Sequence, residues 1–174
     1  MNLYTAPEPF PTDDGKLSIF LAGSIENGTA DDWQSLLTEK LEPYDINVFN
    51  PRRENWDATI QQTKDDPVLN EQVNWELNAL DTAVLIVMYL DPNTKSPISL
   101  MELGLFASRP KMVVCCPEGF YRKGNVDIVC DRYGIPYTND LSTFIDKIVE
   151  FVDQVMNENE PTKKKKTKKE KAPK

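Results

Sequence analysis

Residues 83–90 read AVLIVMYL, an unbroken apolar run with no alternation of polar and apolar positions. A membrane span needs about 20 apolar residues, so this run is too short to cross a bilayer. Continuous apolar character over a short stretch is typical of a strand that is covered on both faces, as in the centre of a parallel sheet. The run therefore predicts the middle strand of an α/β domain.

Strand and helix signals alternate on both sides of this run. On the N-terminal side, strands are predicted at 17–22 and 46–49, a helix at 30–40, and a second helix that begins at Pro67. On the C-terminal side the predicted order is helix 97–107, strand 111–116, helix 125–133, strand 136–138 and helix 141–156. This alternation predicts an α/β fold, a flavodoxin-like doubly wound parallel sheet of about five strands with helices on both faces.

Composition divides the chain into three parts. Residues 1–16 are rich in proline and are expected to form an irregular arm, residues 17–157 the folded domain, and residues 158–174 a disordered lysine-rich tail. Residues 161–174 carry a net charge of +7, whereas the first 160 residues carry −15. An acidic body argues against duplex nucleic-acid binding, which leaves only loose attachment through the tail. A solubilising extension is the favoured interpretation of the tail, and nuclear import is the alternative.

The sequence contains no histidine, which excludes Ser-His-Asp and Cys-His catalysis and histidine-ligated metals. The three cysteines have no metal-ligand spacing, so we expect neither a metal nor another cofactor. Acid–base chemistry must then fall to carboxylates, or to tyrosine, lysine or cysteine. No signal peptide or membrane span is recognisable, and a cytoplasmic protein is expected, with a nuclear one open because of the tail.

Ligands of doubly wound domains bind at the carboxyl ends of the strands, which here selects segments 23–27, 50–57, 91–102 and 117–125. Glu102 is expected near the start of a helix among apolar neighbours, where the helix dipole would keep it ionised though partly desolvated. That state suits a nucleophile, although a glutamate at a helix start is also common for structural reasons alone. After the first strand, Gly23 would let a ligand approach the backbone, and Ser24 can bind a sugar or phosphate oxygen.

The loop at 50–57 combines Arg52, Trp56 and Asp57. An arginine can hold a phosphate with two hydrogen bonds, and a tryptophan can stack on a base. The structural alternative is that the arginine pairs with carboxylates of the acidic surface. Spacing does not decide between the two. Trp75, on the helix that begins at Pro67, is expected to be a core residue.

Together, Gly23-Ser24 after a strand, Asp81 before the apolar run, and Met101-Glu102-Leu103-Gly104 before strand 111–116 resemble the nucleoside 2-deoxyribosyltransferase family and its nucleotide N-glycosidase relatives. The resemblance covers about residues 17–152. It implies a flavodoxin-like fold, a homodimer or higher homo-oligomer, and a retaining reaction in which Glu102 attacks C1′ and expels the base. The glycosyl ester then passes to a second base or to water.

The resemblance also assigns supporting residues. The family has an aspartate that assists the departing base, and the nearest acids here are Glu71 and Glu76, of which Glu76 is the choice. Asn125 corresponds to an asparagine that reaches over from a neighbouring subunit. Ser96 stands where the family often has an aspartate near the sugar hydroxyls. A serine hydrogen-bonds a hydroxyl or phosphate but is not an ionised acceptor, so a catalytically weakened nucleotide-binding sensor stays open. An interaction protein that uses its lysine tail is the other alternative.

Overall fold

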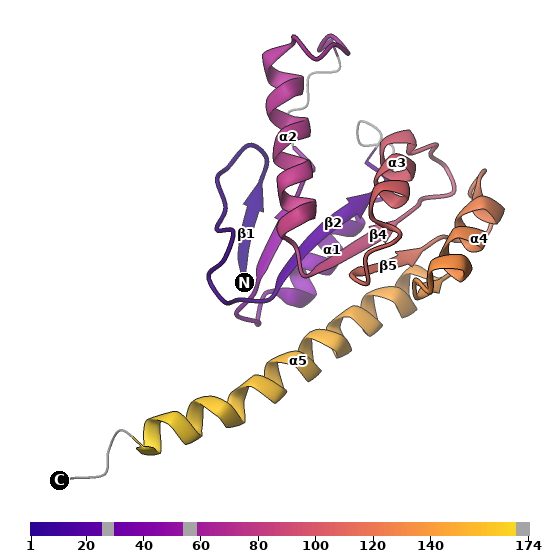
Figure 1. Ribbon diagram of the computed structural model, residues 1–174. Helices are drawn as coiled ribbons and strands as arrows, with labels where there is room; N and C mark the ends of the chain where they lie inside the picture. Colours follow the sequence, from indigo (N-terminus) through magenta and orange to yellow (C-terminus); the bar gives the residue numbers. More distant parts are fainter. Residues whose placement is uncertain (26–29, 54–58, 170–174) are drawn as a thin grey trace.

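The computed structural model describes residues 1–25, 30–53 and 59–169, with side chains as far as Glu158. The described elements form a parallel sheet with helices on both faces (Figure 1), which confirms the predicted flavodoxin-like α/β fold. The strands are β1 Asn2–Thr5, β2 Ser18–Gly23, β3 Asn47–Asn50, β4 Leu85–Tyr89, β5 Met112–Cys115 and β6 Tyr137–Thr138. The helices are α1 Trp33–Leu41, α2 Pro67–Thr82, α3 Pro97–Phe106, α4 Lys123–Tyr133 and α5 Leu141–Lys169.

The strand order in the sheet is β1-β3-β2-β4-β5-β6, and every pairing is parallel. Five of these strands follow the flavodoxin order, and β1 is an additional strand at the edge. The order reverses between β2 and β4, whose pairing places Gly23 opposite Tyr89. Ligands of such sheets bind beyond the carboxyl ends of the strands at this reversal. The segments after β2 and β4 therefore form the candidate site.

The central strand β4 is buried along its whole length, as its apolar run predicts. Its side chains alternate between two hydrophobic cores, with Ile86 and Met88 in one and Val87 and Tyr89 in the other. The first core is completed by α2, α3 and α4, and the second by α1 and α5. Consequently α2 and α3, which carry the two candidate acids, lie on the same face of the sheet.

The N-terminal arm differs from the prediction. Residues 1–16 were expected to be irregular, but Asn2–Thr5 form β1 and pair with β3, so the sheet has six strands rather than about five. The Asn2 side chain donates to the Asn47 carboxamide at 3.0 Å, a contact that a four-residue stretch cannot reveal in advance. Trp75 is a core residue, as expected, and its indole N–H donates to the Glu8 carbonyl at 2.7 Å, which ties the arm to α2.

The last helix also differs from the prediction. It begins at Leu141, as expected, but its backbone continues to Lys169 instead of ending near Met156, so most of the tail expected to be disordered is helical here. Lysine and glutamate are good helix formers, and a helix already begun extends more easily than a new one starts. Figure 1 shows α5 running out beyond the sheet. In the described part of the chain, no helix has both the length and the apolar character to cross a membrane.

Candidate functional site at the carboxyl ends of β2 and β4

Gly23 ends β2 with a φ of 126°, a conformation that favours glycine. A Cβ atom at this position would lie 2.1 Å from the carbonyl oxygen of Tyr89 on β4. Gly23 was predicted to let a ligand approach the backbone, but the neighbouring strand β4 fills this space. The glycine allows β2 and β4 to stay paired up to the point where the candidate site begins, and the amide of Ser24 then donates to the same Tyr89 carbonyl at 2.8 Å.

Three buried hydroxyls meet immediately beyond these strands. Ser24 Oγ lies 2.8 Å from Thr94 Oγ1 and 2.6 Å from Ser96 Oγ, and the Thr94 and Ser96 oxygens are 2.8 Å apart. Ser24 Oγ also accepts the backbone N–H of Asp91 at 2.8 Å, and Thr94 donates to the Asp91 carbonyl. The structure therefore brings the predicted Ser24 and Ser96 together, and their hydroxyls bond to each other within a network that joins the two loops.

Ser96 is the residue before α3 and has a left-handed backbone, with a φ of 43°. Such a conformation is uncommon for a residue with a side chain and costs about 1 kcal/mol or more. Its hydroxyl makes no capping bond to α3 but turns to Ser24 and Thr94. The hydroxyl cluster thus holds the chain in the conformation from which α3 starts, and α3 carries Glu102.

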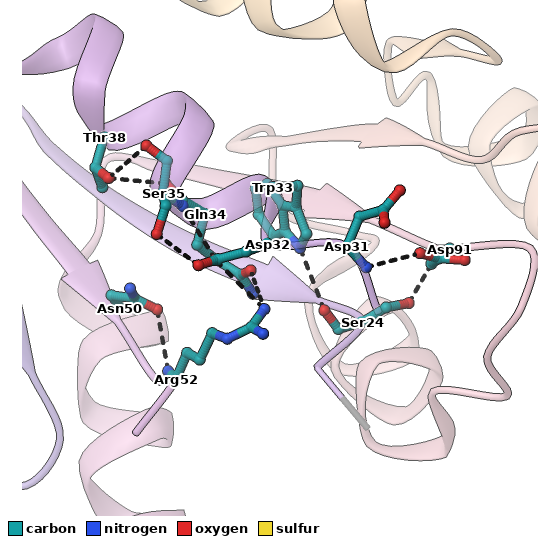
Figure 2. Close-up of polar contacts among 10 residues, drawn as sticks. All are labelled: Ser24, Asp31, Asp32, Trp33, Gln34, Ser35, Thr38, Asn50, Arg52 and Asp91. Carbon is teal, nitrogen blue, oxygen red and sulfur yellow. Dashed lines mark hydrogen bonds and ion pairs between the residues drawn. The ribbon is translucent and has the colours of Figure 1, made fainter. Parts of the chain in front are cut away.

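Asp91 connects this cluster to α1. Its carboxylate accepts the backbone N–H groups of Asp31 at 3.2 Å and of Asn93 at 2.8 Å, while Trp33 donates its indole N–H to the Ser24 carbonyl at 3.3 Å. Figure 2 shows Ser24 with its contacts to Trp33 and Asp91, and the contact of Asp91 with Asp31. Asp91 and Thr94 were not among the predicted site residues. The Asp91-Pro92-Asn93 triplet is a turn signal that could have marked the first of them.

Glu102 lies on the second turn of α3 and is 6% exposed. Burial, and to a smaller extent the negative charge of Glu76, raise the pKa of its carboxyl to about 8. The expectation that the helix dipole keeps Glu102 ionised is therefore wrong for the unliganded protein at neutral pH. The dipole acts mainly within the first turn of a helix, whereas loss of water acts on the whole buried side chain.

Glu76 lies on α2, close enough for its charge to act on Glu102. Burial raises the pKa of its carboxyl too, against the lowering effects of a hydrogen bond from Gln72 and of the positive charge of Arg53. The Gln72 side-chain amide donates to Glu76 Oε1 at 2.7 Å. The two predicted acids thus interact electrostatically. Gln72, one helical turn before Glu76, also belongs to this site, although it was not predicted.

Arg52 follows β3 and turns toward the start of α1. Its guanidinium donates to Gln34 Oε1 at 3.1 Å and lies 3.4 Å from Asp32 Oδ1 (Figure 2). The structural alternative, pairing with a carboxylate, is therefore realised, and a phosphate contact stays a prediction. Trp56 and Asp57, the other candidates in this loop, lie outside the described residues.

Asn125 is exposed on α4, where it lines a cavity of about 300 Å³. The other lining residues are Leu100, Leu103, Gly104, Arg122, Val126 and Val129. Among the described residues, Asn125 makes no side-chain hydrogen bond to the hydroxyl cluster or to either glutamate. Within the described part of the chain, Asn125 therefore shares a cavity with α3 but no hydrogen bond with these residues.

Comparison with known proteins gives one family. A family model described as "Nucleoside 2-deoxyribosyltransferase like" matches residues 16–120, which is more than half of the chain. The matched region contains Gly23, Ser24, Glu76, Ser96 and Glu102. A search of curated proteins finds no match.

Proposed function

Because the chain belongs to the nucleoside 2-deoxyribosyltransferase-like family, we propose that it cleaves or transfers at the N-glycosidic bond of a nucleoside or nucleotide. The observation that carries this proposal is the pair of acids on α2 and α3. Both carboxyls have a pKa raised by burial, and the charge of Glu76 acts on Glu102. Two coupled carboxyls in a dry site can divide the roles of nucleophile and proton donor.

In the proposed reaction Glu102, once ionised, attacks C1′ of the sugar. The bond from C1′ to the base nitrogen breaks, its electron pair leaves with the base, and a protonated Glu76 supplies the proton that neutralises the base. Water or a second base then attacks the glycosyl ester and releases Glu102 as a carboxylate, while Glu76 takes up the proton of the attacking group. The raised pKa of Glu76 favours this proton donation near neutral pH.

The proposal is tested by incubating the protein with a panel of deoxynucleosides and their monophosphates, with and without a second base, and by measuring free and exchanged base by chromatography. Free base together with free sugar indicates hydrolysis, and a nucleoside that carries the second base indicates transfer. Binding of a nucleotide without either product would favour the second candidate, a nucleotide-binding sensor. The observation behind that alternative is Ser96, whose hydroxyl is engaged in the buried cluster where the family often has an aspartate.

We expect Arg52→Ala to lower turnover of monophosphates at least roughly tenfold and to affect free nucleosides little. A charge-assisted contact contributes about 1.5–3 kcal/mol, and ~1.4 kcal/mol corresponds to one decade. Arg52 is suited to this because its side chain stays partly exposed while it contacts Asp32. Ser96→Ala should act in the same direction but less strongly. Equal losses on both substrates would instead make Arg52 a structural residue.

A homodimer or higher homo-oligomer is part of the proposal. On α3, the apolar side chains of Ile98, Met101 and Leu105 are more than half exposed, and the cavity lined by Asn125 lies between α3 and α4. An exposed apolar surface of this kind is typical of an interface. A partner chain on this surface would bring its own candidate site within reach of Asn125. Analytical ultracentrifugation should therefore find a dimer or larger species at micromolar concentration, and a monomer would contradict this.

A further inference from the structure

Gln72 has no role in the reaction as described, yet it is buried in contact with one of the two candidate acids, Glu76. It lies on α2, one turn before Glu76, and the residue is 5% exposed. Its amide nitrogen donates to Glu76 Oε1 at 2.7 Å and to the carbonyl oxygen of Pro51 at 3.1 Å. The side chain thus joins a carboxylate on α2 to the segment that follows β3.

These two contacts determine how the amide is oriented. The nitrogen has two hydrogens, and each faces an acceptor, so turning the amide by 180° would bring its oxygen against a carboxylate and a carbonyl. Among the described residues, the oxygen Oε1 of Gln72 has no hydrogen-bond partner, although it is buried. A buried acceptor without a partner is costly. Gln72 therefore keeps its hydrogen bond to Glu76 although its own oxygen has no partner among the described residues.

A donor fixed beside a carboxylate favours its ionised form. Two charged groups also act on this pair: Arg53 favours the negative charge on Glu76, and a negative Glu76 disfavours a second negative charge on Glu102. Burial raises the pKa of both carboxyls, and Glu102 is the more deeply buried of the two, so burial also favours the proton on Glu102. The hydrogen bond from Gln72 reaches Glu76 and adds to this asymmetry.

We propose that Gln72 is a positioning residue that holds the negative charge of the pair on Glu76 and so leaves the proton on Glu102 in the unliganded protein. The buried nucleophile is then neutral at rest, which avoids an isolated ion in an apolar site. The proton passes from Glu102 to Glu76 when substrate binds, and this transfer produces the two states that the reaction requires. The catalytic consequence rests on the proposed function, whereas the location of the proton does not.

The test replaces Gln72 by methionine, which has a similar length but no donor. Carboxyl carbon NMR of glutamate-labelled, unliganded protein follows the titration of both acids, with signals assigned through Glu76→Gln and Glu102→Gln. In wild type, Glu76 should titrate below Glu102. In Gln72→Met, the pKa of Glu76 should rise by roughly one unit, the size of one hydrogen bond to a charged group, and that of Glu102 should fall.

Gln34→Met is the matched control. Gln34 is a second buried glutamine, and its side chain accepts a hydrogen bond from Arg52 but contacts neither acid. The control should leave both titrations unchanged. A rise of both pKa values in Gln72→Met, or no shift, would overturn the proposal, and so would a wild-type Glu102 that titrates below Glu76. The last measurement applies even if the variant fails to fold. None of these titrations needs a substrate, so they separate this proposal from a failure to detect base release.

Discussion

Glu102→Gln is expected to lower base release at least about 10³-fold and to leave the fold intact. Glutamine has nearly the same shape but cannot form the glycosyl ester, and loss of a nucleophile removes the covalent route. The assay is single-turnover base release measured by chromatography, with circular dichroism to show that the variant is folded. Near-native turnover would remove Glu102 from the mechanism.

The same variant is expected to be more stable than wild type at alkaline pH. The unfolded Glu102 carboxyl titrates near 4.5, and the folded one near 8. Between these values the unfolded chain releases a proton that the folded protein keeps, so the stability of wild type falls as pH rises through this interval. Glutamine does not ionise, so the advantage of Glu102→Gln should be absent below about pH 4.5 and level off above about pH 8. Each pKa unit corresponds to about 1.4 kcal/mol, which gives a total of a few kcal/mol.

Denaturant unfolding of both proteins across this pH range measures the effect. Glu150→Gln is the control, since Glu150 is an exposed glutamate on α5, and its unfolding free energy should follow wild type at every pH. A stability difference for Glu102→Gln that did not change with pH would contradict the assignment of a buried, protonated Glu102.

Gly23→Ala is expected to destabilise the protein by more than about 4 kcal/mol or to prevent folding. The added Cβ would lie 2.1 Å from the Tyr89 carbonyl oxygen and 2.8 Å from its backbone nitrogen, distances at which the two strands must separate. The backbone at φ 126° is also unfavourable for alanine. Because β2 and β4 are neighbours in the middle of the sheet, their separation disrupts both hydrophobic cores.

Gly104→Ala provides the contrast within the same chain. Gly104 lies inside α3, and a Cβ atom there would meet nothing within 4 Å. Alanine is favoured over glycine in a helix interior by roughly 0.5–1 kcal/mol, so this variant should be as stable as wild type or slightly more stable. Thermal unfolding followed by circular dichroism compares the two. A Gly23→Ala protein that melts within a few degrees of wild type would show that the sheet can adjust.

Much of the architecture was predictable from local patterns. The apolar run at 83–90 predicted the central strand because a strand covered on both faces has no polar side, and Pro67 marked the start of α2 because its ring suits the first turn. The short edge strand β1 was missed because four residues carry no periodicity of their own, and pairing with β3 determines their conformation. Local reasoning also marked Glu102, near the start of a predicted helix, whereas Glu76 was selected only through the family resemblance.

Only the tertiary structure decided how these acids are held and how their surroundings shift their pKa values. Gln72 meets Pro51 across 21 positions of sequence, and Ser24 meets Ser96 across 72, so no local pattern reports either contact. The state of Glu102 depends on the water removed by packing and on a charge contributed by another helix. The sequence by itself determined which residue types stand at the ends of the strands. The packing of distant segments determined which of them are buried, which are bonded to each other and which carry charge, because burial and electrostatic interactions act through space rather than along the chain.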